Sequence, residues 1–133
     1  MNFIGKIWLI DDEIFIYLTG KLFKSLEINE NVEVFENGQL AISHLRDLII
    51  KKLTLPDFIF LDIMMPVLNG WGFLDEYVQF PSKSKDRISL FILSSSISPQ
   101  DVQRAKGIIE VEDYITKPLT MENLSTIIRN NSI

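Results

Sequence analysis

The sequence predicts an α/β fold, with a doubly wound, parallel five-stranded sheet and helices on both of its faces. Short apolar runs rich in bulky and branched residues alternate along the chain with longer segments whose apolar residues recur at helical spacing. Five strands that alternate with five helices imply crossover connections, and these make the sheet parallel. The chain has 133 residues, of which 47% are hydrophobic, so we expect a single domain over 1–133 with its own core.

The first half of the chain contains three of the expected strands. They lie at 6–10, 31–35 and 58–61, and the last is the most strongly apolar run in the sequence. One helix, at about 15–29, follows the first strand, and its apolar residues form a single stripe. A second helix runs from the Asn37-Gly38 turn signal toward Lys51-Lys52, whose positive charges suit a helix C-terminus.

The second half repeats this alternation. We expect a loop at 64–70 that contains Pro66, a helix at 71–80, a polar connection at 82–86 and a strand at 88–93. Ser98-Pro99 has the pattern of an N-cap followed by proline at the first helical position, and this helix stops at Gly107. A strand at 114–116 and a helix at 119–129 complete the prediction.

Composition argues against several classes of protein. With 13 basic and 18 acidic residues the net charge is −5, so the chain as a whole does not attract nucleic acid. It has no cysteine and no run of 18 apolar residues, so we expect a cytoplasmic protein without disulfides or a membrane span. The sequence also lacks the motifs of two enzyme classes. The glycine-rich motifs that bind nucleotide phosphates are absent.

The only histidine, His44, is expected at the surface or boundary of a helix, away from the serines after the fourth strand that a hydrolase triad would need.

Polar residues follow four of the five expected strands. In a parallel sheet the carboxyl ends of the strands share one edge, where ligands collect, and the residues there are Asp11, Asp12, Glu13, Asp62, Ser94, Ser95, Ser96 and Lys117. Carboxylates this close need a compensating cation, and Mg²⁺ prefers such oxygen ligands. Asp62, which ends the most buried strand, is then the best candidate for a nucleophile that attacks a phosphoryl group, with Lys117 and Ser94 stabilising its oxygens.

Each of these residues has a simpler interpretation when it is taken alone. Asp11 and Asp12 suit the N-terminus of a helix, where the dipole stabilises acids. Lys117 has the pattern of a surface lysine, and Tyr114 that of sheet packing. Their coincidence at one predicted edge of the sheet is what favours a site.

These motifs together resemble the receiver (CheY-like) domain of bacterial two-component response regulators. The resemblance covers essentially the whole chain, and its motifs are Trp8-Leu9-Ile10-Asp11-Asp12-Glu13, Phe60-Leu61-Asp62-Ile63-Met64-Met65-Pro66 with Asn69-Gly70, Leu93-Ser94-Ser95, and Asp113-Tyr114-Ile115-Thr116-Lys117-Pro118. It implies a flavodoxin-like (βα)5 three-layer sandwich with strand order 2-1-3-4-5.

The resemblance also implies a role for each matching residue. Asp62 is similar to the phosphoacceptor, and Asp12 to a direct Mg²⁺ ligand. Asp11 would act on the ion through water, and the backbone carbonyl of Met64 would complete the protein ligands. Ser94 and Lys117 match the positions that contact the phosphoryl group. Ser94 and Tyr114 also match the switch pair, in which an aromatic ring turns inward as the hydroxyl moves.

The same resemblance implies partners and an output. The phosphodonor would be a sensor histidine kinase or a phosphotransfer protein. Because the sequence stops soon after the last helix, we expect a stand-alone receiver with no effector domain, which signals through protein contacts and not through nucleic acid or a membrane. The expected contact face, formed by the fourth helix, fifth strand and fifth helix, includes Arg104, Lys106, Tyr114 and Met121.

Two positions beside the expected phosphoryl site are unusual in their chemistry. Met64 has an apolar side chain that cannot orient an attacking water, and Ser96 is small and polar. We therefore expect slow autodephosphorylation, and no enzymatic activity beyond this and self-phosphorylation from phosphodonors.

Two other functions stay open from the sequence. One is a phosphorylation-independent protein-binding module, against which the complete acidic site argues. The other is a Mg²⁺-dependent phosphohydrolase, which would want a substrate pocket and a dedicated general acid or base, and neither is visible.

Overall fold

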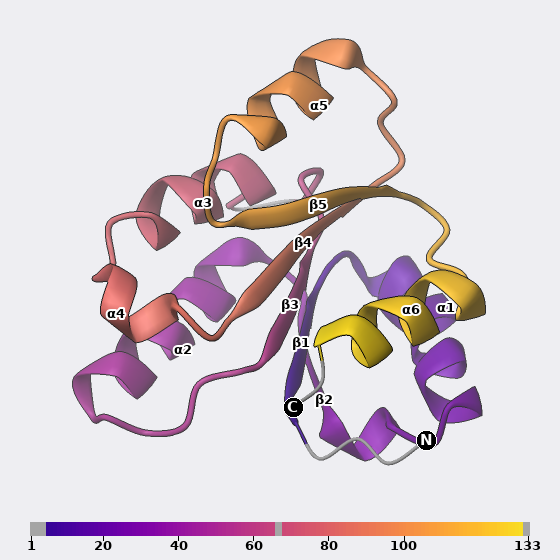
Figure 1. The fold of residues 1–133 in the computed structure, drawn as a ribbon, viewed down its shortest axis with the longest axis horizontal. Coiled ribbons are helices and arrows are strands. Elements are labelled where there is room, and N and C mark those ends of the chain that lie inside the picture. The colour runs from indigo at the N-terminus through magenta and orange to yellow at the C-terminus, as the bar shows by residue number, and fades with distance from the viewer. Residues whose placement is uncertain (1–4, 66–67, 132–133) are drawn as a thin grey trace.

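Five parallel strands form the middle layer of the structure, and helices cover both faces (Figure 1). The computed structural model describes residues 5–65 and 68–131, so Pro66 of the expected loop lies outside the described residues. The strands are β1 (Ile7–Ile10), β2 (Val32–Phe35), β3 (Phe58–Leu61), β4 (Ser89–Ser94) and β5 (Val111–Thr116). Their order is β2-β1-β3-β4-β5, as the resemblance implies.

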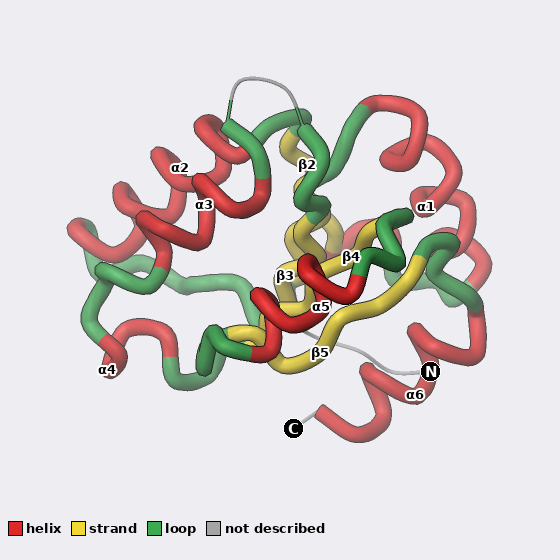
Figure 2. Tube along the Cα trace, turned by 90° about the horizontal axis from the view of Figure 1, so that it is seen from above, coloured by secondary structure: helices red, strands yellow, loops and turns green. Residues whose placement is uncertain are grey.

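The connections between the strands are helical. The α-helices in the described part are α1 (Glu13–Ser25), α2 (Gly38–Ile50), α3 (Gly70–Tyr77), α4 (Ser82–Lys85), α5 (Pro99–Lys106) and α6 (Met121–Asn131), and a short 3-10 helix, η1 (Asn29–Asn31), precedes β2. Figure 2 shows α2 and α3 on one side of the sheet and α1 and α6 on the other.

Alternate side chains of the strands divide the core into two clusters. In β3, Ile59 and Leu61 pack with the cluster under α2, α3 and α5, whereas Phe58 and Phe60 pack with the cluster under α1 and α6. Every residue of β1 and β3 is buried, because these central strands are covered on both faces. This explains why both strands are continuous apolar runs in the sequence.

The strand register brings the carboxyl ends of the central strands level with one another. Ile10 pairs with both Phe35 and Leu61. Immediately after these pairs, the Asp11 N–H donates to the Phe35 carbonyl at 3.1 Å and the Asp62 N–H donates to the Ile10 carbonyl at 2.8 Å. The backbone therefore holds Asp11 and Asp62 side by side.

Two glycines allow the loop after β3 to fold tightly at this edge. A Cβ atom on Gly70 would lie 2.5 Å from the backbone oxygen of Asp62 and 2.5 Å from the Cα atom of Ile63. A Cβ atom on Gly38 would lie 2.6 Å from the backbone oxygen of Leu68, which instead accepts a hydrogen bond from the Gly38 N–H. Any other residue at these positions would push the loop away from Asp62.

One expected connection was wrong. The segment at 82–86 was predicted to be a polar connection, but Ser82–Lys85 forms the short helix α4, which makes a sixth α-helix in the described chain. Lys85 is buried, and its Nζ atom donates to the Tyr77 carbonyl at 2.8 Å and to Glu110 Oε2 at 3.1 Å. These tertiary contacts stabilise a turn too short to show helical periodicity.

Strand β5 begins earlier than the predicted 114–116. Its first residues include the exposed Glu112 and Asp113, which an apolar pattern does not reveal. Such charges suit an edge strand, and an irregularity in the pairing between Leu90 and Phe91 accompanies them. His44 lies at the boundary, half-buried against the rings of Trp8 and Phe35.

None of the helices within residues 5–65 and 68–131 combines the length and the apolar composition that crossing a bilayer requires.

Candidate functional site

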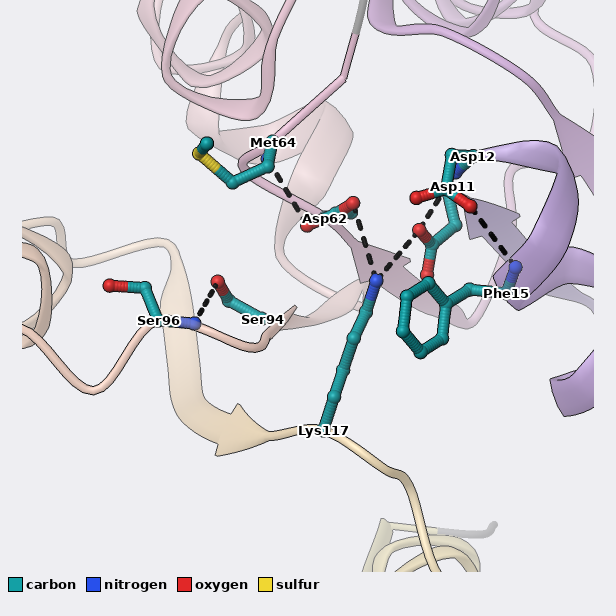
Figure 3. A network of polar contacts seen from close by, with 8 residues as sticks. All are labelled: Asp11, Asp12, Phe15, Asp62, Met64, Ser94, Ser96 and Lys117. Carbon is teal, nitrogen blue, oxygen red and sulfur yellow. Dashed lines mark hydrogen bonds and ion pairs between the residues drawn. The ribbon is translucent and has the colours of Figure 1, made fainter.

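Three carboxylate side chains meet at the carboxyl edge of the sheet (Figure 3). Asp11 and Asp12 follow β1, and Asp62 follows β3. The exposed fractions of Asp11 and Asp62 are only 0% and 3%, and Asp12 is half-buried. One oxygen atom from each carboxylate lies within 4.8 Å of the others. The structure thus brings together three acidic residues from two strands that are far apart in the sequence.

Asp12 has a second role as the N-cap of α1. Its Oδ1 atom accepts a hydrogen bond from the Phe15 N–H at 3.1 Å. The Asp12 N–H in turn donates to Asp11 Oδ1 at 2.7 Å. The simpler interpretation of Asp12 as a helix cap is therefore correct, and the cap also holds this carboxylate within the acidic cluster.

Lys117 directly follows the carboxyl end of β5, and its side chain extends to the carboxylates. Its Nζ atom lies 2.9 Å from Asp11 Oδ1 and 3.3 Å from Asp62 Oδ2, and its side chain is 4% exposed. The Lys117 N–H donates to the Ser94 carbonyl at 2.8 Å, which anchors the backbone beside β4. A buried ammonium group thus bridges two buried carboxylates.

One ammonium group does not satisfy this cluster. The pKa of Asp11 is raised to about 7, chiefly by burial and also by the neighbouring Asp62, although Lys117 acts in the opposite direction. Asp11 Oδ2 is buried and has no hydrogen-bond partner. An unpartnered carboxylate oxygen among three converging carboxylates fits a hard divalent cation such as Mg²⁺, which takes oxygen ligands.

Met64 lies in the loop after β3, two residues beyond Asp62. Its N–H donates to Asp62 Oδ1 at 3.1 Å, so one acceptor oxygen faces the backbone and the other faces Lys117. The Met64 side chain is 66% exposed and points away from Asp62 in Figure 3. Asn69 then caps α3 by accepting from the Gly72 N–H at 2.9 Å.

The hydroxyl group of Ser94 lies at the end of β4 and is completely buried. Its oxygen accepts a hydrogen bond from the Ser96 N–H at 3.1 Å. The Ser96 carbonyl accepts from the Tyr114 hydroxyl at 2.7 Å, and Ser96 Oγ donates to Asp101 Oδ2 at 2.6 Å. Ser96 therefore links Ser94, Tyr114 and the first turn of α5 in one network.

Two residues of this region were missed by the sequence analysis. Asp101 accepts from Ser96, and the ring of Phe15 lies under Lys117, with 3.5 Å between Nζ and the ring centroid. Asp101 could have been noticed as an acid in the first turn of a helix. Phe15 had no such signal, because its partner lies almost at the other end of the sequence.

The expected output face is formed by α5, β5 and α6. Lys106 is exposed, Met121 is 42% exposed and Tyr114 is half-buried. Arg104 stacks on the ring of Trp71, with 4.3 Å between its guanidinium carbon and the ring centroid. This contact ties α5 to α3, although Arg104 itself is exposed.

Comparison with known proteins identifies the family. The family model of the response regulator receiver domain matches residues 7–129. The chain belongs to this family. As a receiver domain, it is a phosphorylation-dependent switch of two-component signalling. Receiver domains are in general signalling modules and not enzymes, and they typically bind Mg²⁺ at an acidic pocket.

Individual relatives agree with this family. The receiver domain resembles a two-component response regulator from Cytophaga hutchinsonii, with a TM-score of 0.79, 28% identity and 98% of each chain covered. It resembles the phosphorylated cyanobacterial phytochrome response regulator RcpA, with a TM-score of 0.74, 27% identity, and coverage of 95% of this chain and 89% of the other. The probable methanogenesis regulatory protein FilR2 of Methanothrix harundinacea is 27% identical over 86% of this chain and 72% of its own length.

Proposed function

We propose that this receiver domain accepts a phosphoryl group on Asp62. The observation that carries the proposal is the buried contact of 3.3 Å between Lys117 Nζ and Asp62 Oδ2, next to the unpartnered Asp11 Oδ2. In the transfer, an Asp62 oxygen attacks phosphorus, and the bond from phosphorus to the donor's imidazole nitrogen breaks. That nitrogen keeps the electron pair and takes up a proton.

The metal ligands in this proposal are Asp11, Asp12, Asp62 and the backbone carbonyl of Met64. When bound, Mg²⁺ neutralises the carboxylates and the oxygens of the phosphoryl group. Asp12 would hold the ion directly, and Asp11 would hold it through water. Lys117 pairs with the carboxylates in the resting protein and transfers its contact to a phosphoryl oxygen.

Phosphorylation acts on the network around Ser96. The phosphoryl group adds about −1.5 to −2 charges and strong acceptor oxygens. The Ser94 hydroxyl then leaves the Ser96 N–H and donates to a phosphoryl oxygen, while the Tyr114 hydroxyl leaves the Ser96 carbonyl and its ring turns inward. Both bonds that must break are present in the resting structure, at 3.1 Å and 2.7 Å.

The partners in this proposal follow from the family. The donor is a sensor histidine kinase or a phosphotransfer protein, and the related regulator RcpA was solved in its phosphorylated form. The output passes to a protein target that contacts the face of α5, β5 and α6, where Lys106, Tyr114 and Met121 lie. A cytoplasmic location is part of the same proposal.

Loss of the phosphoryl group is slow in this proposal. Water attacking phosphorus would pass the side chains of Met64 and Ser96. Met64 offers no hydrogen bond, and the Ser96 hydroxyl already donates to Asp101 at 2.6 Å. Self-phosphorylation and this slow hydrolysis are the only reactions that we assign to the domain itself.

Labelling with a small phosphodonor tests the proposal. Wild-type protein incubated with Mg²⁺ and acetyl phosphate should gain one phosphoryl mass that is stable in acid and labile in base, and Asp62→Asn should gain none. Asp57→Asn serves as a matched control. Asp57 lies just before β3, at the end of the strand opposite to Asp62, and its carboxylate accepts a hydrogen bond from the Lys6 N–H. Labelling that persists in Asp62→Asn would move the nucleophile elsewhere.

A further inference from the structure

Lys117 has an uncharged partner besides its two carboxylates. The Nζ atom lies 3.5 Å from the centroid of the Phe15 ring, within the range of a cation–π contact. An ammonium group has three N–H bonds. In the resting structure the Asp11 carboxylate, the Asp62 carboxylate and the face of this ring surround it (Figure 3).

The acidic cluster fixes the backbone of Phe15 beside the site. The Phe15 N–H donates to Asp12 Oδ1, so the first turn of α1 is tied to one of the proposed metal ligands. The Phe15 side chain is half-buried, whereas Ile14 and Tyr17 on the same helix are 71% and 65% exposed. Phe15 therefore turns its ring toward the site and not toward solvent.

Binding of a divalent cation changes the forces on Lys117. In the proposed metal-bound state the cation would bind the carboxylates of Asp11 and Asp62, which hold the ammonium group at 2.9 and 3.3 Å in the resting structure. The cation would also repel the ammonium group, because both are positively charged. The Phe15 ring carries no charge and does not ligate Mg²⁺. It is the one of these three partners that the metal leaves unchanged.

We propose that Phe15 is a positioning residue for Lys117, and that its ring face keeps the ammonium group in the site after a divalent cation has taken the carboxylates. This inference rests on the proposed function, because it assigns Phe15 to the step between metal binding and phosphoryl binding. Without the ring, Lys117 would move outward and would have to be drawn back when a phosphoryl group arrives.

Calorimetric titrations of Phe15→Leu test this with two ligands. Mg²⁺ alone should bind as tightly as to wild type or slightly more tightly, because the ammonium group can now retreat from the cation. The phosphoryl mimic beryllofluoride, added with saturating Mg²⁺, should bind about two- to tenfold more weakly, as expected for one lost cation–π contact. A parallel loss of affinity for both ligands would indicate a loosened site and would contradict the proposal, as would unchanged beryllofluoride affinity.

Matched variants separate the ring contact from other effects. Phe15→Tyr keeps a ring face and should bind beryllofluoride as wild type does. Tyr17→Leu removes another ring of the same helix. The Tyr17 ring also contacts a lysine, with 4.8 Å between Lys21 Nζ and the ring centroid, but Tyr17 lies on the exposed side of the helix. Tyr17→Leu should leave both affinities unchanged. A loss in Tyr17→Leu equal to that in Phe15→Leu would overturn the assignment.

Nuclear magnetic resonance gives a readout without any phosphoryl group. The Lys117 side-chain methylene signals of wild type should be shifted upfield by the ring, and should stay so when Mg²⁺ is added. In Phe15→Leu the upfield shift should be absent. If Mg²⁺ abolishes the shift in wild type, the ring does not hold the lysine and the inference fails.

The two proposals fail in different ways. If wild-type protein takes up neither acetyl phosphate label nor beryllofluoride, the proposed function fails, whatever the lysine signals show. If wild type is labelled but Phe15→Leu matches it in beryllofluoride affinity, the function stands and the role of Phe15 is wrong.

Discussion

The hydroxyl group of Tyr114 donates a hydrogen bond of 2.7 Å to the carbonyl of Ser96, which lies just beyond the buried hydroxyl of Ser94. This bond holds β5 against the loop after β4 in the resting protein. In the activation that we propose, Tyr114 turns inward and this bond breaks, so the bond should oppose activation.

Removing that hydroxyl should favour the activated state. We expect Tyr114→Phe to bind beryllofluoride about two- to tenfold more tightly than wild type in the presence of Mg²⁺, the effect of one net hydrogen bond lost from the resting state only. Calorimetric titration measures this. Tyr17→Phe, whose side chain is 65% exposed, should not change the affinity. Weaker binding to Tyr114→Phe would show that the bond supports the active state instead.

The Asp11 carboxyl group should make the stability of the metal-free protein depend on pH. Its pKa rises from the ordinary value of 3.8 to about 7, chiefly because it is buried. Since the folded pKa lies above the unfolded one, the stability that this group contributes is fully present below about pH 4 and is lost as the pH rises through 7. Asp11→Asn should therefore be more stable than wild type at pH 8 by about 1–3 kcal/mol.

Urea unfolding without Mg²⁺ checks this, and the difference between the two proteins should shrink toward pH 5. Saturating Mg²⁺ should reverse the order at pH 8, because only the ionised carboxyl group helps to hold the cation. A metal-free wild type that is the more stable protein at pH 8 would refute the prediction.

Gly70 should be essential for the loop that follows Asp62, the proposed phosphoacceptor. A Cβ atom there would lie 2.5 Å from backbone atoms of Asp62 and Ile63, so Gly70→Ala should cost about 2 kcal/mol or more and weaken Mg²⁺ binding. Gly20 is the matched control, since it lies within α1 and has nothing within 4 Å of its added Cβ atom. Gly20→Ala should stabilise the protein by about 0.5–1 kcal/mol in the same denaturation experiment. Equal effects would contradict the steric argument.

Met64 should set the lifetime of the phosphoryl group. Its exposed thioether cannot orient water, whereas an amide at this position can. We expect Met64→Asn to lose its label about three- to tenfold faster after removal of phosphodonor, the value of one added hydrogen bond to the attacking water. Met64→Leu should decay at the wild-type rate. A slower decay of Met64→Asn would show that the side chain acts in another way.

Much of the fold was readable because buried parallel strands leave a strong local signal. The apolar run at 58–61 coincides with β3, and the polar residues that end β1 and β3 meet at one edge, as parallel strands require. Elements with weak apolar patterns were missed or shortened. Helix α4 depends on Lys85, whose contacts with Tyr77 and Glu110 come from other elements, and the start of β5 is charged because that strand is at an edge.

By itself, the sequence determined the layers of this receiver domain and the side chains available at the carboxyl edge of its sheet, because hydrophobic periodicity and strand ends are local properties. Tertiary structure alone decided which of those side chains touch. The ring of Phe15 under Lys117, the Tyr114 hydroxyl on Ser96 and the unpartnered oxygen of Asp11 all depend on how distant elements pack together. Such contacts form only when packing brings separate segments within a few ångströms, and no local pattern encodes that distance.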